Sequence, residues 1–176
     1  MRQRFFPSLT TERLLLRQLQ PSDDKAIFAL RSNEAVNTYI QRPLSNNIDD
    51  ARYFITSITE GVNNKEWLYW AMILKDTQQL VGTICLWHFS DDKSTAEIGY
   101  ELHPSYQGKG LMDEALKGII NYGFNILQLT TIEAYTQPAN ERSIKLLEKN
   151  NFVKGPINNS SAVSREIQFI LRKSTT

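Results

Sequence analysis

Two glycines, Gly108 and Gly110, flank Lys109 immediately before a segment with helical periodicity. In that segment apolar residues recur every three or four positions, which predicts a helix over 111–127 with one apolar face. Glycine allows a tight turn and the close approach of a ligand. The first turn of a helix adds free N–H groups and a partial positive charge. The pattern predicts a phosphate-binding turn, unless the glycines serve the geometry of the turn alone.

Two carboxylates lie on the predicted strand that leads into this turn, over 95–102. Alternation along the strand puts Glu97 and Glu101 on one face, opposite Tyr100 and Leu102. A carboxylate beside a bound substrate can accept a proton as a general base. An exposed position, or an ion pair with a basic neighbour, explains the same pattern equally well.

The remaining segments predict a mixed α/β chain that surrounds this strand and helix. Both faces of the strand over 66–75 are apolar, as expected in a sheet covered on both sides. The other predicted elements are a strand over 14–19, a helix beginning at Pro21, a less regular stretch over 36–42, a helix capped by Asn47 and ended by Gly61, strands over 79–89 and 131–135, a helix capped by Asn140 that ends at 150–151, and strands over 152–153 and 165–171 around a loop at 158–160.

Composition limits the class of protein. The 176 residues fit one domain over 1–176, with 22% charged residues and a net charge of +1. This balance argues against nucleic acid or an anionic membrane as a partner, because both select a basic surface. The lone cysteine, Cys85, is expected to be a buried structural thiol. We find no apolar run of membrane-spanning length and no apolar signal-peptide core at the N-terminus, and therefore expect a cytoplasmic protein.

The glycine turn also carries a resemblance to a known family. Residues 107–112 resemble the Gln/Arg-x-x-Gly-x-Gly/Ala signature of the Gcn5-related N-acetyltransferase (GNAT) superfamily. Residues 97–100, 140–143 and 11–17 are similar to motifs of its RimJ/RimL-type branch, in the family's order along essentially the whole chain. The resemblance implies a central mixed, mostly antiparallel sheet with helices on both faces, which is an α/β fold of the α+β type.

Two positions depart from the family pattern. Met112 stands where the signature has glycine or alanine, although this branch often has methionine there. Asn151 replaces the glycine that usually follows the last helix. Asparagine tolerates the left-handed conformation that ends many helices, so we expect Asn151 to take the place of that glycine.

The resemblance implies acetyl-CoA as cosubstrate and a primary amine as acceptor, without a metal ion. In the family, the N–H groups of the glycine turn face the pyrophosphate and the preceding strand pairs its backbone with the pantetheine arm. The capping asparagine also contacts that arm. The cofactor-binding residues implied in this way are Tyr100, Leu102, His103, Gln107, Gly108, Lys109, Gly110, Leu111, Met112, Asn140 and Ser143.

The same resemblance suggests how protons move. Glu97 lies ten residues before Gln107, the spacing of the glutamate base in superfamily members that use one, and Glu101 is the second candidate. Many members protonate the thiolate with a tyrosine seven residues after the asparagine, but Leu147 occupies that position here. RimL-like members point to Ser143 instead. A thiol pKa near ~8.5 also makes the CoA thiolate an acceptable leaving group without an acid.

Two functions therefore remain open. The first is N-acetylation of a protein or peptide α-amine, or of a small-molecule amine, by direct attack in a ternary complex. The second is a non-catalytic acyl-CoA-binding module, which would need the glycine turn and Asn140 but not Glu97. Glu97, Glu101 and Ser143 together favour the enzyme, as a monomer or homodimer. We expect the acceptor pocket around 36–47 and 156–163, and neither segment identifies the amine.

Overall fold

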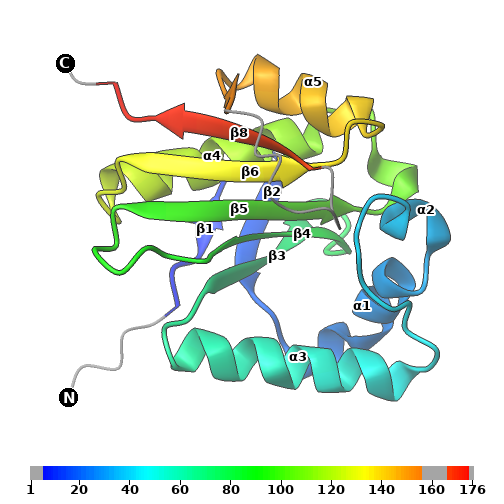
Figure 1. Cartoon of the computed structure of the whole chain (residues 1–176). Helices are drawn as coiled ribbons and strands as arrows, with labels where there is room; N and C mark the ends of the chain where they lie inside the picture. The colour runs from blue at the N-terminus through cyan, green and yellow to red at the C-terminus, as the bar shows by residue number, and fades with distance from the viewer. Residues whose placement is uncertain (1–5, 156–165, 175–176) are drawn as a thin grey trace, which may run out of the picture.

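The computed structural model describes residues 6–155 and 166–174. Within these residues eight strands form one sheet in the order β1-β2-β3-β4-β5-β6-β8-β7, and helices cover both faces (Figure 1). The strands are β1 (Leu9–Thr10), β2 (Leu14–Gln18), β3 (Leu68–Leu74), β4 (Leu80–Trp87), β5 (Thr95–Leu102), β6 (Thr131–Thr136), β7 (Val153–Lys154) and β8 (Ile167–Arg172). The α-helices are α1 (Asp24–Arg31), α2 (Glu34–Asn37), α3 (Ile48–Asn63), α4 (Leu111–Asn125) and α5 (Glu141–Lys149). The predicted mixed sheet is confirmed.

Most helix ends follow the predicted capping residues. Asn47 and Asn140 accept backbone N–H groups as N-caps of α3 and α5. Asn151 has the predicted left-handed conformation, with φ of 64°. The predicted end of α3 at Gly61 is wrong, because the helix continues to Asn63. Gly61 serves packing instead: a Cβ there would lie 1.9 Å from the Trp67 indole.

Strand β1 and the four-residue helix α2 are further differences between the predicted and observed elements. Strand β1 was not predicted, because two residues are too few to show an alternating pattern. The predicted loop at 158–160 and the expected pocket segment 156–163 lie outside the described residues. No helix in the ranges 6–155 and 166–174 is long and apolar enough to cross a membrane.

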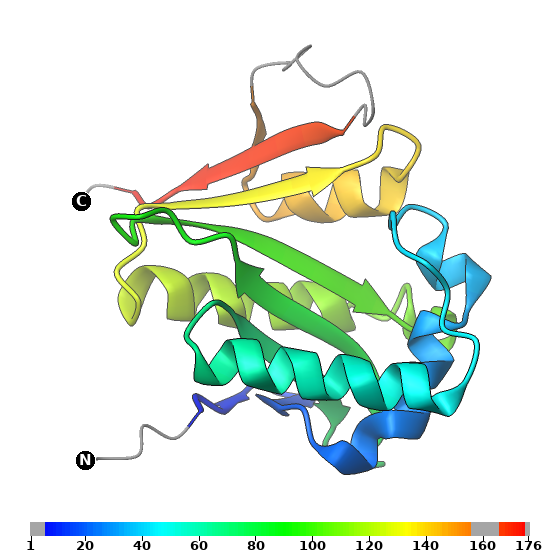
Figure 2. The same ribbon diagram turned by 60° about the horizontal axis from the view of Figure 1, so that its bottom comes forward.

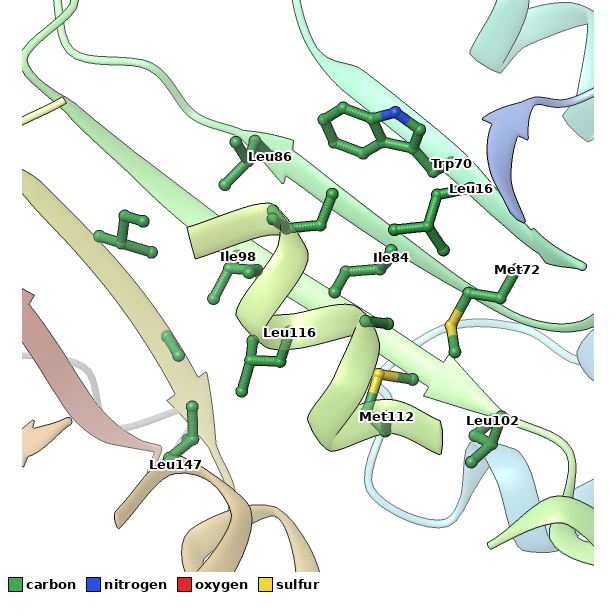
Figure 3. Packing of buried hydrophobic residues seen from close by; sticks show 14 of the residues in the cluster. Leu16, Trp70, Met72, Ile84, Leu86, Ile98, Leu102, Met112, Leu116 and Leu147 are labelled. Atoms are coloured by element: carbon green, nitrogen blue, oxygen red, sulfur yellow. The ribbon is translucent and has the colours of Figure 1, made fainter. Parts of the chain in front are cut away.

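Helix α4 lies against one face of the sheet and forms the larger core with it. Figure 3 shows Met112 and Leu116 of α4 over Ile84, Leu86 and Ile98 of the central strands. Each of these side chains is buried, and full burial of one such side chain stabilises the fold by about 1.5–3 kcal/mol. Because the Met112 side chain points into this core, its departure from the family signature does not obstruct the turn.

The opposite face is covered by α1 and α3, which pack on β3 and β4. Ile27 and Leu30 of α1 and Ile55 of α3 are buried with Ala71 and Ile73 of β3. The apolar character of β3 on both faces is thereby explained, as predicted. Cys85 is buried in this second core, and burial raises the pKa of its thiol to about 12, so it stays a neutral thiol.

The central strands β5 and β6 are joined by helix α4 and run parallel. Their pairing covers only Thr95–Glu97 of β5 against Thr131–Glu133 of β6. Beyond this point β6 continues to pair with β8 and β5 with β4, and the two strands diverge toward their carboxyl ends (Figure 2). The helices α4 and α5 begin at the open end of this divergence (Figure 1).

Asp113 in the first turn of α4 fastens α5 to α4. Its carboxylate lies 2.8 Å from Lys149 Nζ and 3.0 Å from Lys117 Nζ, and Asn150 donates a hydrogen bond of 2.8 Å to it. Burial raises the pKa of Asp113, but the hydrogen bonds from Lys149, Asn150 and Lys117 outweigh it and lower the pKa to about 2. The ionised carboxylate is therefore favoured in the folded state.

We predict that Asp113→Asn lowers the free energy of unfolding by about 1 kcal/mol at pH 7, because both lysines are largely exposed and their ion pairs are screened. A carboxylate with a lowered folded-state pKa stabilises the fold above its unfolded pKa of ~3.9. The difference should shrink as pH falls from ~4 toward ~2. Urea unfolding across this range measures it, with exposed Asp49→Asn as control; a difference independent of pH would contradict the assignment.

Candidate active site

The glycine turn presents a run of unused backbone donors. Gly108 and Gly110 have φ of 75° and 76°, in the left-handed region that glycine adopts without strain. The first backbone bond of α4 is donated by Glu114 to Gly110. The N–H groups of residues 108–113 donate to no acceptor within the described part of the chain. Consecutive free N–H groups at a helix N-terminus are suited to bind an anion, and the phosphate-binding role of this turn stays a prediction.

Two cations flank this turn. Lys109 places its ammonium 5.3 Å from the centre of the Tyr106 ring. The Arg13 guanidinium binds the Lys109 carbonyl at 2.9 Å and the Glu114 carboxylate at 2.7 Å. Sequence reasoning gave Arg13 no role, because it comes from a distant segment and only the fold brings it to the turn. It braces the turn from outside while Lys109 remains exposed.

Backbone groups of β5 face the gap toward β6. His103 N–H donates to the Val81 carbonyl at 2.8 Å, and backbone groups alternate along an antiparallel ladder. Those of Tyr100 and Leu102 therefore point the other way, toward β6. The predicted role of the His103 backbone is not supported, because its N–H is used by Val81 and its carbonyl accepts from Tyr106.

Gln107 connects the end of β5 to the start of α5. Its side-chain amide donates to the Leu102 carbonyl at 2.9 Å and its oxygen accepts from the Arg142 guanidinium. This leaves the Leu102 N–H for a ligand but engages its carbonyl. Arg142 lies between the two motif residues Asn140 and Ser143, yet its contact with Gln107 could be found only in the fold.

Tyr100 and Ser143 meet across the gap. The Tyr100 hydroxyl lies 2.8 Å from Ser143 Oγ, and Asn140 Oδ1 accepts the Ser143 N–H at 3.2 Å. Burial raises the pKa of Tyr100 to about 12, although its bond to Ser143 lowers it, so the phenol stays protonated at neutral pH. Leu147 is fully buried in the core and offers no acid. The hydroxyl groups that the structure brings together here are those of Tyr100 on β5 and Ser143 on α5.

Glu101 is committed to a buried ion pair. Its carboxylate binds the Arg42 guanidinium and accepts from Thr83 Oγ1 at 3.1 Å, and its side chain is only 4% exposed. Arg42 also donates to Asn37 Oδ1 at 2.6 Å. The second candidate base is therefore better explained as the anchor of the loop that follows α2. The alternative of a basic neighbour, left open by the sequence, applies to Glu101.

We predict that Glu101→Gln lowers the free energy of unfolding by about 1–3 kcal/mol, because it leaves the half-buried Arg42 without its charged partner. Chemical denaturation measures this cost. The matched control is Glu148→Gln, whose side chain is 51% exposed and 4.0 Å from Lys154. If Glu101→Gln instead kept full stability and lost turnover, the carboxylate would be catalytic after all.

Glu97 lies where β5 and β6 begin to separate, and its environment differs from that of Glu101. Glu97 Oε2 is 2.8 Å from His88 Nδ1, and its side chain is 19% exposed. Its register partners are Trp87 on β4 and Glu133 on β6. Sequence reasoning missed His88, because the contact depends on the turn after β4, where His88 has φ of 45°.

The predicted acceptor segment 36–47 lies beside the open end of the sheet. Gln137, in the loop after β6, donates a hydrogen bond of 3.3 Å to the Tyr39 carbonyl. This contact joins the loop after α2 to the loop before α5. A surface hollow of about 410 Å³ lies between α1 and the segment 103–106 that leads into the glycine turn. A second hollow, of about 840 Å³, lies between α4 and the β7–β8 edge.

Comparison with known proteins identifies the family. The family described as acetyltransferase (GNAT) domain matches residues 13–153. The chain is 36% identical over 149 residues to the uncharacterized N-acetyltransferase YoaA of Bacillus subtilis (strain 168), covering 85% of this chain and 84% of that protein. It is 27% identical over 157 residues to the Escherichia coli (strain K12) [ribosomal protein uS5]-alanine N-acetyltransferase, covering 83% and 78%.

A solved structure shows the same fold. The microcin C7 self-immunity acetyltransferase MccE, solved in complex with acetyl-CoA and AMP, superimposes with a TM-score of 0.82 at 19% identity. The match covers 92% of this chain and 93% of that chain. The chain belongs to the GNAT family of acetyltransferases, and with its relatives it is an acetyl-CoA-dependent N-acetyltransferase.

Proposed function

We propose that this protein transfers the acetyl group of acetyl-CoA to a primary amine, by direct attack in a ternary complex. The observation that carries the proposal is the juxtaposition of the free N–H groups of 108–113 with the divergence of β5 from β6. One feature suits a pyrophosphate and the other suits an extended amide-containing arm. Glu97 lies at the last position of β5 that pairs with β6, where the divergence begins.

The residues of this chain fit such a cosubstrate. Free donors and positive φ at Gly108 and Gly110 suit the diphosphate, and Lys109 adds positive charge. The Tyr100 and Leu102 backbone groups would bind the arm as a neighbouring strand does. Acetyl-CoA supplies a thioester whose carbonyl an amine can attack. The protein holds both reactants in one orientation, which lowers the entropic part of the barrier.

Two groups near the gap would serve the proton changes. Glu97 is the carboxylate on the acceptor side, where the ammonium form of the amine must lose a proton. Ser143 is the hydroxyl on the side of the sulfur. Because the neutral Tyr100 phenol can donate to Ser143 Oγ, the serine proton is left to stabilise the departing thiolate.

We propose an α-amine of a protein or peptide as the acceptor. An α-amine loses its proton near ~7.7–8.0, whereas a lysine amine does so near ~10.4, so a weak base suffices for it. The relative from Escherichia coli is named for an alanine of a ribosomal protein. The acceptor side of the sheet also ends at the exposed loop after α2, which leaves room for an extended chain.

The test is turnover of acetyl-CoA with a panel of amines. We expect acetylation of short peptides with a free α-amine, and less of the same peptides carrying lysine as their only free amine. Preference for a small-molecule amine would change the acceptor class. Binding of acetyl-CoA without turnover on any amine would favour the non-catalytic acyl-CoA-binding module, and absence of binding would refute both.

We predict that Gly110→Val lowers acetyl-CoA affinity at least tenfold, about 1.4 kcal/mol, because a branched side chain crowds the site facing the turn. A Cβ at Gly110 or Gly108 meets no protein atom closer than 3.5 Å. Gly108→Ala and Gly110→Ala should therefore cost only about 1–2 kcal/mol of backbone strain. Calorimetric titration and thermal unfolding separate the two effects.

The control is Gly118→Ala within α4, where an added Cβ makes ordinary contacts at 3.4 Å and 4.0 Å and φ is not positive. A helical glycine replaced by alanine should keep or raise stability. Affinity should not change. If Gly110→Val bound acetyl-CoA like the wild type, the glycine would serve the turn alone, which is the alternative raised from the sequence.

A further inference from the structure

His88 is held by Glu97 in a defined orientation. Its Nδ1 lies 2.8 Å from Glu97 Oε2. The His88 backbone has φ of 45°, a conformation uncommon for residues other than glycine. The imidazole is 70% exposed, whereas Glu97 is 19% exposed. The carboxylate is thus the inner member of the pair and the histidine is the member that a substrate can reach.

The ring is also fixed from one side by an aromatic neighbour. The His88 imidazole stacks on the Trp87 indole, with centroids 4.8 Å apart and planes 8° apart. Trp87 in turn lies over Gly99 of β5, where a Cβ would come within 3.7 Å of the indole. Gly99 precedes Tyr100 on the strand that borders the gap, so this aromatic pair packs on the strand whose backbone would bind the cosubstrate arm.

A histidine bonded to a carboxylate through Nδ1 has one favoured neutral tautomer. When Nδ1–H donates to Glu97, Nε2 carries the lone pair and is free to accept a proton. Imidazole is the side chain that ordinarily changes charge between pH 5 and 8, which suits it to act as a general base near neutral pH. The carboxylate stabilises the imidazolium that results.

We propose that His88, oriented by Glu97, takes the proton from the acceptor amine, so that Glu97 is a positioning residue for this base. The inference deepens the proposed function and rests on it. The amine nitrogen forms a bond to the acetyl carbon and the carbon–sulfur bond breaks. The electron pair leaves with the sulfur as thiolate, and the surplus amine proton passes to His88 Nε2 and then to solvent.

Other ionisable groups share this surface with His88 and Glu97. Glu133 is the register partner of Glu97 and accepts from the Tyr135 hydroxyl at 3.0 Å. Burial, followed by Glu133 and Glu97, raises the pKa of Tyr135 to about 12. On the hairpin that follows His88, hydrogen bonds from Ser90 and Ser94 lower the pKa of Asp92 to about 2. Asp91 and Lys93 are exposed on the same hairpin.

The first arm of the test reads the pair without acetyl transfer. The chain has only two histidines, so the imidazole C–H resonances can be assigned with His103→Gln. We expect the imidazole nitrogen resonances of His88 to report the tautomer protonated at Nδ1 in the wild type and a weaker preference in Glu97→Gln, because the charged acceptor is gone. An unchanged tautomer preference would show that the two side chains do not interact in solution, and would overturn the proposal.

The second arm measures kcat/KM against pH with the best peptide of the amine panel. His88→Gln should lower kcat/KM by about 10²–10⁴-fold and abolish the decline on the acid side that the wild type shows, while acetyl-CoA affinity stays the same. Glu97→Gln should lower the rate less than His88→Gln does, because the base remains and only its orientation is lost. Asp91→Asn, an exposed carboxylate on the same hairpin, is the control for charge.

The outcomes separate this inference from the reaction on which it rests. If His88→Gln keeps the wild-type rate and pH profile while Glu97→Gln loses both, the carboxylate is the base itself and the inference is wrong. If both variants behave like the wild type, neither residue handles the proton. If the wild type transfers acetyl to no amine, the proposed function fails and the inference falls with it.

Discussion

The early loss of pairing between β5 and β6 is the constraint on which the rest of the site depends. Three residue pairs join these strands, and beyond Glu97 their carboxyl ends part while each stays bonded to its other neighbour. The parting exposes backbone groups of a central strand, which is costly unless something binds them. It also sets the starts of α4 and α5 side by side, and Gln107, Arg142 and Asp113 hold them there.

The two faces of β5 carry different tasks. On the face covered by α4, Tyr100 reaches Ser143 and the glycine turn follows directly. On the opposite face, the side chains of Glu97 and Glu101 point the same way but have different surroundings. Glu101 is buried against Arg42 and holds the loop after α2, whereas Glu97 stays near the surface with His88. One strand thus separates the side suited to the cosubstrate from the side suited to the acceptor.

Local patterns in the sequence were enough for the sheet, the glycine turn and the asparagine caps, because each depends on residues close together in the chain. The distinction between Glu97 and Glu101 could not be made in this way, since it depends on Arg42 and His88, which reach them only in the fold. Gly61 shows the same limit. Glycine often marks the end of a helix, but here its lack of a side chain leaves room for the Trp67 indole.

The insertion of α1, α2 and α3 between β2 and β3 has a consequence for the order of folding. Strands β3, β4 and β5 are joined by short turns and form an antiparallel meander from local contacts, whereas pairing of β2 with β3 must close a long segment. Contacts between residues far apart in sequence are slower to form. The Arg42–Glu101 pair joins residues 59 positions apart and is expected to form late for the same reason. A variant that weakens this ion pair should unfold faster and fold at nearly the same rate. The pair then contributes to kinetic stability, because it slows unfolding.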